Sequence, residues 1–489
     1  MTYTAQEQQA SQELESKLLE KYKPFTLNDA VAVTGLHVGS VRRALEILIS
    51  KYHCALKVTE NGDLIYDFGK SLRRRGERTW AEFFQGFLNT LWKIFMIVFK
   101  IWIAITLVTY FVVFIVILIV IIVVMLSKAS KDDDDSLGNV VGAFFNALGE
   151  IFKHILTWNT HTDNYYYVTD NQGYTYRQYE PTPSPLAVID KEKKEEKSFV
   201  AAVYDFVFGP ERAEIHPLAN QQEVASYIRK NKGLITTAEI IGLAGWKGEE
   251  AEDFLADCVA RFNGEPKISE NKVLYVDFYE LSRSQNTTQD VPVIWYWDEY
   301  EPEYHLNGND AWTNGGIIFM GVFNLIFGLV FMTMTMEPVD EVLQGFTSQQ
   351  IYYISLFLGT IPTLFSTIFF TVPILRYFYI QPARYRRVQN NIRKRVMKAI
   401  FQHYNEPITL EKLERWINAG KEASLSTATI KSHMKQLVQD LWGDMEVDSQ
   451  TGSISYVFNR LRDELNEIER LKSLRKDDID LGNVVIDID

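Results

Sequence analysis

The chain has 489 residues, a formal net charge of −13 and a mean hydropathy of −0.11, so most of it is soluble material joined to a smaller apolar part. The sequence pI of about 5.3 argues against a protein whose main task is to hold a polyanion through many phosphate contacts. The two cysteines, Cys54 and Cys258, are far apart and form no CxxC pair, which argues against zinc, iron–sulfur and dithiol sites.

In chain order, the first predicted unit is a module from Phe25 to Phe68, here called module 1. Thr26 opens a helix, Gly35 closes it, and a second helix follows with Val41, Leu45 and Leu48 at helical spacing. An NGD turn and the alternating strand LIYDF end the module. The N-terminus has no basic start or apolar core of a secretory signal, so we expect module 1 in the cytosol.

The most apolar part of the chain follows, and Ile101 to Leu126 contains no charge, glycine or proline. This stretch exceeds the roughly 20 residues needed to cross a bilayer. The preceding segment, Trp80 to Lys100, is aromatic but carries charges, which suits either a helix in the headgroup region or a plain extension of the span.

The region from 127 to 197 is predicted to contain an amphipathic helix, a hairpin and a linker. The apolar residues of the helix are Val140, Phe144, Leu148, Ile151, Phe152 and Ile155, a pattern that suits a membrane surface or a partner helix. Asn164 to Tyr179 is a Tyr-rich hairpin candidate with a turn at Asp170 to Gly173. The run Asp132 to Asp135 is typical of a solvated linker, so we predict no metal site there.

Two later segments repeat the plan of module 1. Module 2 runs from Leu234 to Phe278, with Thr236, Gly245 and a closing strand VLYVDF. Module 3 runs from Ile408 to Phe458, opens at Thr409 and closes with QTGSISYVF. Two or three helices followed by a β-hairpin are typical of a winged helix, so we expect three winged-helix-like modules.

Between modules 2 and 3 the sequence predicts a transmembrane hairpin at 316–336 and 351–375. An aromatic segment before it is predicted to lie at the cytosolic interface as a belt; its members are Trp295, Tyr296, Trp297, Asp298, Glu299, Tyr300 and Trp312. A basic flank after it should place that end in the cytosol; its members are Arg376, Arg384, Arg386, Arg387, Arg393, Lys394 and Arg395.

The flanking charges of the first span conflict with this topology, because arginines at 73–75 and 78 also favour a cytosolic N-terminal side. One span cannot have both ends in the cytosol. Either 87–126 forms a tight hairpin or re-entrant element, or module 1 lies outside, or the middle region lies outside. We favour the hairpin, because 40 residues can supply two short spans, although 101–126 contains no turn residue.

The sequence contains no Walker A, GxSxG, HExxH or nucleotide-binding GxGxxG pattern, so we expect no enzymatic activity and no cofactor. The three spans also contain no ionisable residue, which disfavours an ion or proton carrier.

Helix-turn-helix modules read DNA with their second helix, so its charge decides between DNA and protein as a partner. Module 2 has the acidic stretch KGEEAEDFLAD there, whereas module 1 has Arg42 and Arg43 beside Glu46. Module 3 offers Lys431, His433 and Lys435, the best candidate face for nucleic acid or a partner, although a solvated face is the simpler interpretation.

The order of these parts resembles a little-characterised family of cyanobacterial and plant chloroplast membrane proteins. The resemblance rests on NGDLIYDFGKSLR, FVAAVYDFVFGPE, RFNGEPKISENKVLYVDF and FTVPILRYFYIQPARYRRVQNNIRKR, and it covers most of residues 25–397. Module 3 and the acidic tail depart from the plastid members. Some of those members have been labelled as iron–sulfur cluster biosynthesis proteins, but two distant cysteines give that label no support. The resemblance implies a shared architecture and supplies no mechanism.

The predicted fold class is an α+β membrane protein with about three winged-helix-like soluble modules joined to transmembrane helices. The predicted domains are 1–72 (module 1), 80–126 (interfacial helix and first membrane segment), 127–197 (amphipathic helix, hairpin and linker), 198–290 (module 2), 291–315 (aromatic segment), 316–375 (transmembrane hairpin), 376–460 (basic segment and module 3) and 461–489 (charged helix and acidic tail).

The leading functional hypothesis is a scaffold in a bacterial inner membrane, with mostly cytosolic modules that contact other proteins. Its partners would be the lipid bilayer and unidentified proteins, with a homo-oligomer left open and DNA disfavoured. The alternatives are a membrane-tethered DNA-binding regulator that acts through module 1 or 3 and, less favoured, a transport accessory subunit.

Overall fold

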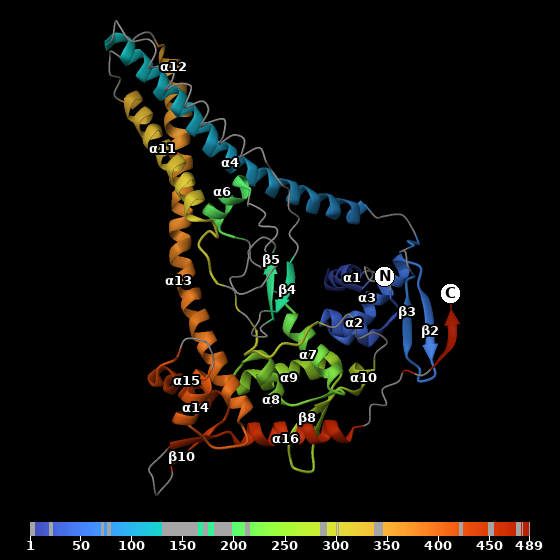
Figure 1. Cartoon of the computed structure of the whole chain (residues 1–489). Helices are drawn as coiled ribbons and strands as arrows, with labels where there is room; N and C mark the ends of the chain where they lie inside the picture. Colours follow the sequence, from blue (N-terminus) through green and yellow to red (C-terminus); the bar gives the residue numbers. More distant parts are fainter. Residues whose placement is uncertain are drawn as a thin grey trace.

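The computed structural model describes residues 5–18, 23–69, 73–75, 80–129, 165–169, 175–179, 198–210, 216–283, 291–299, 301, 303–336, 346–419, 424–447, 454–475, 481 and 483–488. Three helices of this part are long and apolar enough to cross a membrane. They form the membrane bundle, which extends away from a body that holds the three modules (Figure 1).

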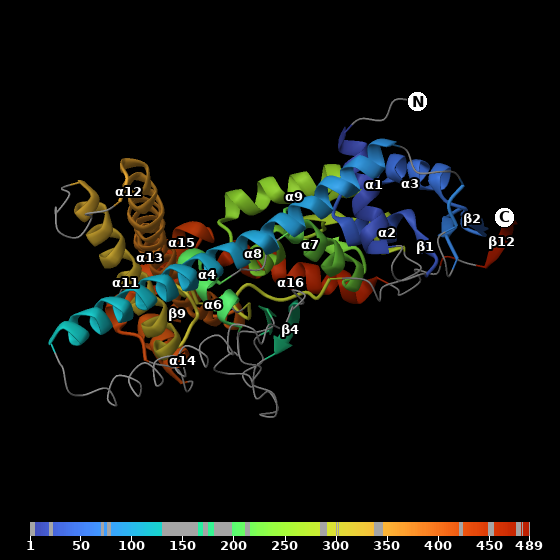
Figure 2. The same ribbon diagram turned by 90° about the horizontal axis from the view of Figure 1, so that it is seen from above.

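The first membrane segment is one continuous helix, α4 (Trp80–Ala129), of 50 residues. The predicted hairpin within 87–126 is therefore wrong. Because residues 101–126 contain neither glycine nor proline, nothing in that stretch interrupts the helical hydrogen bonds. At 1.5 Å per residue the helix is about 75 Å long, more than twice the roughly 30 Å of a hydrocarbon core. Its N-terminal half thus extends beyond one crossing, over the body (Figure 2).

The other two spans pack as an antiparallel hairpin. The first is α11 (Ala311–Met336), and the second comprises α12 (Ser348–Ile354), the π-helical turn η2 (Ser355–Thr360) and α13 (Ile361–Gln402). The predicted hairpin is thus present, but its second arm does not end at residue 375. Instead α13 continues to Gln402 and becomes the first helix of module 3 (Figure 1).

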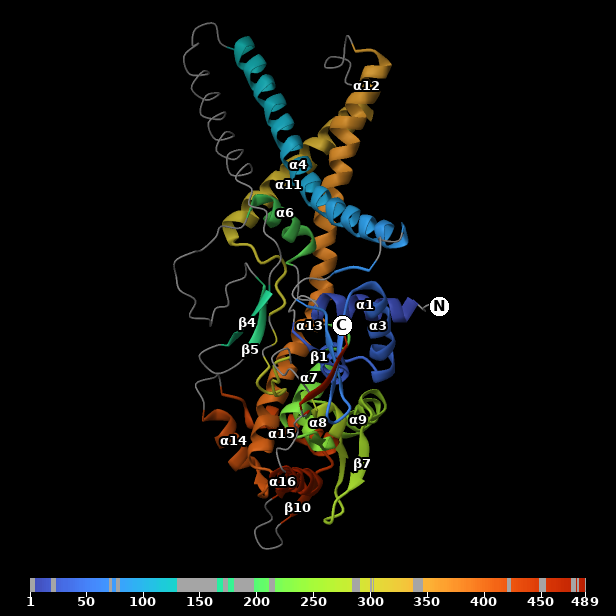
Figure 3. The same ribbon diagram turned by 90° about the vertical axis from the view of Figure 1, so that its right-hand side faces the viewer.

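Aromatic side chains hold α4 against α11. Phe111 lies with its ring 5.2 Å from Phe323, and Phe114 lies 5.6 Å from Phe327. Both helices therefore run in the same direction, and their C-terminal ends lie at the same far end of the bundle. There α4 and α12 diverge (Figure 3).

A short apolar helix, α6 (Phe199–Phe208), fills the base of the bundle. Phe206 stacks on Phe369 at 5.4 Å, and the side chain of Asn309 donates to the carbonyl of Ala202 at 2.8 Å. The C-terminal end of α4 thus lies at the far end of the bundle, whereas α6 lies beside the body.

The three modules have the same order of elements. Module 1 consists of α1 (Ala5–Leu18), β1 (Phe25–Thr26), α2 (Leu27–Thr34), α3 (Val38–Lys51), β2 (Ala55–Thr59) and β3 (Leu64–Asp67). Module 2 consists of α7 (Ala219–Lys230), β6 (Leu234–Ile235), α8 (Thr237–Ala244), α9 (Gly248–Phe262), β7 (Glu265–Ile268) and β8 (Leu274–Asp277), followed by the short α10 (Tyr279–Ser282). Module 3 consists of the end of α13, β9 (Ile408–Thr409), α14 (Leu410–Asn418), α15 (Thr427–Asp440), β10 (Asp444–Val447) and β11 (Ile454–Val457).

Each module also has the same antiparallel sheet order, in which the short first strand pairs with the last strand of the hairpin. Local residues explain the recurrence. Thr26 caps α2 with a capping box, and at the start of α8 the amide of Thr236 donates to the carboxylate of Glu239 at 3.2 Å. Gly35 and Gly245 end these helices in the left-handed region, with φ of 68° and 70°, which a residue with a Cβ adopts only with strain.

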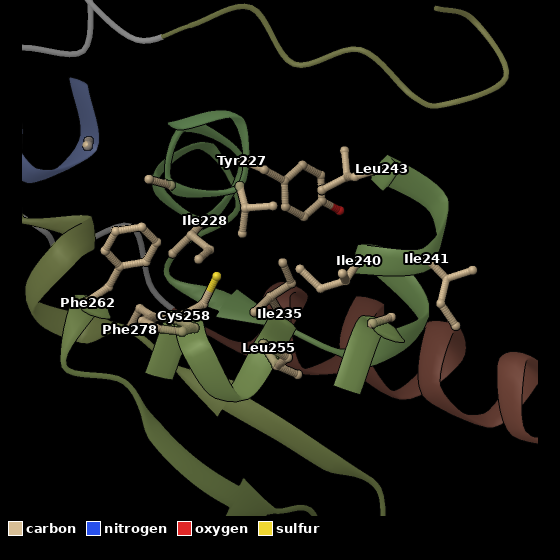
Figure 4. Close-up of a cluster of buried hydrophobic side chains, with 14 of the residues drawn as sticks. Tyr227, Ile228, Ile235, Ile240, Ile241, Leu243, Leu255, Cys258, Phe262 and Phe278 are labelled. Atoms are coloured by element: carbon tan, nitrogen blue, oxygen red, sulfur yellow. The ribbon is translucent and has the colours of Figure 1, made fainter. Parts of the chain in front are cut away.

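Each module has an apolar core between its helices and its sheet. In module 2, Ile228, Ile235, Leu255, Cys258 and Phe278 converge from both helices and strands (Figure 4). The buried side chains of all three modules belong to one continuous cluster, so the modules form one body rather than separate domains.

The C-terminal segment ties the modules together. α16 (Asn459–Leu474) leaves module 3 and packs on α8 of module 2. β12 (Val484–Ile488) then adds a fourth strand to the sheet of module 1, with Ile488 opposite Leu56 (Figure 1). The predicted charged helix is present, and residues 484–488 of the predicted acidic tail form an added strand, which local sequence signals did not predict.

Two other predictions have different outcomes. The Tyr-rich hairpin is present as the antiparallel strands β4 (Tyr165–Thr169) and β5 (Thr175–Tyr179). The amphipathic stretch around Val140 to Ile155, the run Asp132 to Asp135 and the turn at 170–173 lie outside the described residues.

The predicted aromatic belt is wrong for Trp295 and Trp297, which pack against the core of the body. Trp295 contacts Tyr227 at 5.7 Å between ring centroids, and Trp297 contacts Phe401 at 4.8 Å. Trp312, in contrast, is 90% exposed at the start of α11, where a belt residue would lie.

Candidate interaction surfaces

The basic flank of α13 binds the connector, defined as residues 291–310 between module 2 and α11. Three arginines donate to main-chain carbonyls of the connector. Arg376 reaches Leu306 at 2.9 Å, Arg384 reaches Tyr304 at 2.7 Å, and Arg387 reaches Glu301 at 2.7 Å. These hydrogen bonds fix the connector along α13.

Two lysines extend this row toward module 3. Lys394 donates to the carbonyl of Glu299 at 2.8 Å, and Lys398 pairs with Asp298 at 2.6 Å. Burial lowers the pKa of Lys394, and nearby Glu299 and Glu301 oppose that shift. The row of five cations therefore fastens the connector along α13.

The remaining predicted flank residues have separate roles. Arg393 pairs with Asp440 of α15 at 2.6 Å, and Arg395 donates to the carbonyl of Ile417 at 3.0 Å. Arg386 lies in an exposed position. Most of the flank thus supports the internal structure of module 3 and of the connector.

A further arginine contact fixes α6 to the bundle. The guanidinium of Arg376 lies where a Cβ of Gly209 would stand, 1.1 Å from that position. Gly209 has φ of 80°, so both space and backbone require glycine at the end of α6.

The candidate partner faces of modules 1 and 3 are partly as expected. Arg42 and Arg43 are exposed on α3, as are Lys431 and Lys435 on α15. His433 is wrong as a member of this face, because it is 8% exposed and lies within 3.0 Å of the side-chain oxygen of Gln389. The cause is helical geometry, since His433 shares the inward face with Ile430 and Leu437. Burial lowers its pKa, with a further contribution from Arg393.

The corresponding helix of module 2, α9, presents an acidic surface. Glu249, Glu250, Glu252 and Asp253 are exposed along its outer side. Arg460 of α16 pairs with Glu252 at 2.5 Å, which neutralises only one of them. The face would repel a phosphate backbone.

Modules 1 and 2 meet through buried polar contacts. Arg229 of α7 pairs with Asp29 of α2 at 2.5 Å, and the two side chains are 0% and 2% exposed. Gln222 donates to the carbonyl of Thr34 at 3.0 Å, and Arg283 pairs with Asp63. Because a buried charge is costly unless it is paired, loss of either partner would leave an uncompensated charge at this interface.

Modules 2 and 3 meet through α16. Lys472 pairs with Glu239 at 2.5 Å, and the hydroxyl of Tyr227 donates to the same carboxylate at 2.6 Å. Glu464 accepts a hydrogen bond from the amide of Ala238 at 2.8 Å. Glu239 occupies in module 2 the capping-box position that Asp29 occupies in module 1. Both carboxylates therefore cap their own helix and receive a cation from another module.

The two cysteines are free and buried. Burial raises the pKa of Cys54 to about 11 and raises that of Cys258 as well, so neither thiol is activated. Among the described residues, no group of three or more His, Cys, Asp or Glu side chains could hold a metal ion.

Comparison with known proteins gives no match to a family model, to a curated protein or to a solved structure.

Two features of these surfaces were not predicted from the sequence: the hydrogen bonds of the α13 cations to the connector, and the ion pairs between modules. The sequence does hold a signal for the first feature. The five cations that contact the connector recur at helical spacing and so share one face of a helix, at positions 376, 384, 387, 394 and 398. For Arg229 and Asp29, 200 residues apart, the sequence holds no comparable signal.

Proposed function

We propose that this chain is an integral membrane scaffold whose three modules are winged-helix-like and form one rigid platform for protein contacts. The observation that supports it is the continuous core that joins the modules, reinforced by the buried pair Arg229–Asp29. The element order of helix, short strand, two helices and β-hairpin is that of a winged helix, which serves in protein contacts as well as in DNA binding.

The platform is coupled directly to the membrane. α13 is one helix from the bilayer into module 3, and the connector is fastened along it by five cations. A partner that binds the body would therefore be held at a fixed distance and orientation from the bilayer. We place the body on the cytosolic side of a bacterial inner membrane.

This proposal also resolves the conflict between the flanking charges. Because modules 1 and 2 share one core, they must lie on the same side of the membrane. α4 carries the chain to the far end of the bundle and α6 lies near the body. The C-terminal end of α4 and the helix α6 therefore lie at opposite ends of the bundle, as expected if modules 1 and 2 share one side of the membrane.

Single reporter cysteines would test this topology, since both native thiols are buried. We expect Glu46→Cys, Ala260→Cys and Gln439→Cys to react with an impermeant thiol reagent from one side of sealed vesicles, and Gln349→Cys from the other. All four positions are exposed. Labelling of positions 46 and 260 from opposite sides would contradict the shared platform.

The rival function is DNA binding through module 3, which the exposed Lys431 and Lys435 favour. The full chain in nanodiscs should bind duplex DNA weakly, because the acidic face of α9 belongs to the same rigid body. Tight binding with a steep salt dependence that is lost in Lys431→Glu/Lys435→Glu, but retained in the control Arg386→Glu, would replace the scaffold with a DNA-binding regulator.

A further inference from the structure

The apolar part of α4 is longer than a single crossing can use. It runs from Thr90 to Val124, which is 35 residues or about 52 Å. A crossing of roughly 30 Å would need a tilt of about 55° to take up that length, whereas transmembrane helices tilt by 0–40°. Tilt alone therefore does not place the whole apolar part inside the bilayer.

The contacts of α6 indicate where the crossing begins. The ring of Phe99 lies 6.0 Å from that of Phe208, and Nζ of Lys100 lies 4.7 Å from the ring centroid of Tyr204. Because α6 fills the base of the bundle, the crossing starts near these two residues of α4. The N-terminal half of α4 lies at the level of α6, with module 1 below it in both side views (Figures 1 and 3).

One side of this N-terminal half carries an exposed apolar stripe. Its members recur at intervals of three and four residues and so share one face of the helix: Phe84, Phe87, Leu88, Leu91, Phe95 and Val98. Each is between 46% and 59% exposed. The stripe continues along the same side of the crossing through Trp102 and Val120, which are both 55% exposed. An apolar surface of this kind indicates an interaction site.

The opposite side of α4 changes character at the base of the bundle. Lys93 and Lys100 lie on it, and helical spacing continues it to Ala104, Leu107 and Phe111. Those last three side chains are 1%, 0% and 4% exposed, because they pack inside the bundle. The side that faces the bundle in the crossing therefore carries lysines where the helix leaves the bundle, while the outer side stays apolar throughout.

We propose that residues 84–98 of α4 lie along the surface of the bilayer leaflet nearest the body, with the apolar stripe in the acyl chains and Lys93 toward water. Lipid is the occupant of the stripe because the stripe runs without a break into the exposed side of the crossing, which lipid surrounds. An apolar face opposite a lysine is typical of helices in the headgroup region. Trp92, 64% exposed at the border of the stripe, lies at the depth that tryptophan favours.

This placement would give the body a second attachment to the bilayer, next to module 1 and in addition to α13. The inference rests on the proposed crossing of the membrane by α4, and it does not depend on the use of the modules for protein contacts.

Spin labels on single cysteines of the full chain test this placement in nanodiscs that hold one copy, so that no second copy can cover the stripe. The variants are Leu91→Cys and Phe95→Cys on the stripe and Lys93→Cys on the opposite side, and both native thiols are buried. We expect the labels at 91 and 95 to collide more often with oxygen, which concentrates in lipid, than with a water-soluble nickel chelate. The label at 93 should show the reverse order.

Two matched controls separate this inference from the proposed function. Val120→Cys, on the exposed side of the crossing, should report lipid, and Glu46→Cys, exposed on module 1, should report water. Chelate access at 91 and 95 equal to that at 46, with 120 still in lipid, would overturn the inference alone, because the helix would then project into water. Equal protection at 91, 93 and 95 would also overturn it, because the helix would then lie within the acyl chains. Chelate access at 120 would contradict the crossing itself.

Discussion

Removal of Arg229 should separate module 1 from the rest of the body. In Arg229→Met the carboxylate of Asp29 loses its cation, while it still accepts hydrogen bonds from the amide of Thr26 at 2.8 Å and from its hydroxyl at 2.9 Å. The loss of one partner of a buried pair costs roughly 3–5 kcal/mol, and the two retained hydrogen bonds favour the lower end. About 3 kcal/mol corresponds to roughly a 10²-fold increase in the population in which module 1 is detached.

Cys54 and Cys258 provide the assay, because one buried thiol lies in module 1 and the other in module 2. When opening is fast relative to labelling, the labelling rate follows the open population. We expect Arg229→Met to speed the labelling of Cys54 in nanodiscs by about 10²-fold and that of Cys258 by much less.

Three further variants make the experiment decisive. Arg229→Lys should give an intermediate rate, since it keeps the charge but not the guanidinium geometry. Arg229→Met/Asp29→Asn should recover part of the loss, because no unpaired carboxylate remains at the interface. The control Arg386→Met removes an exposed arginine and should leave the rate unchanged. If Arg229→Met labels Cys54 at the wild-type rate, the pair does not join the modules and the reasoning fails.

Two other predictions concern charge and the added strand. Burial raises the pKa of Glu223 to about 7, so the stability of the fold is highest below pH 4.5 and falls as the pH rises through 7 and the carboxylate ionises. Glu223→Gln keeps an acceptor for the amide of Ile294, which Glu223 accepts at 2.8 Å. This variant should raise the free energy of unfolding at pH 8 by about 1–2 kcal/mol and have little effect at pH 4.5. Equal effects at both pH values would contradict this cause. Deletion of residues 481–489 should increase amide hydrogen exchange in β2, which pairs with β12, and leave β10 and β11 unchanged; unaltered exchange in β2 would show that the strand does not protect this edge.

Local signals in the sequence specify the elements of each module. Thr26 and Gly35 predict the start and end of α2, and Thr236 and Gly245 do the same for α8, because capping and the left-handed backbone depend on a few neighbouring atoms. The apolar spans follow from composition alone in the same way. These features depend on no distant residue, so the sequence predicts them.

The errors arose where competing local signals had to be weighed. Flanking arginines favoured a hairpin within α4, but 26 residues without glycine or proline continue a helix whatever the topology requires. His433 was grouped with Lys431 and Lys435 by charge, although its position relative to Ile430 and Leu437 places it on the inward face. Periodicity was the better guide in both cases.

The sequence by itself determined the three modules as units and the apolar segments that enter the membrane, because helix caps, turns and hydrophobicity act over a few residues. Only the tertiary structure decided that the modules form one body, that the basic flank binds the connector, and that residues 484–488 add a strand to the sheet of module 1. These features depend on partners such as Asp29 and Arg229, which are 200 residues apart. A charged residue in the sequence indicates that a buried side chain would need a partner of opposite charge, but only the folded chain determines which partner lies close enough to pair with it.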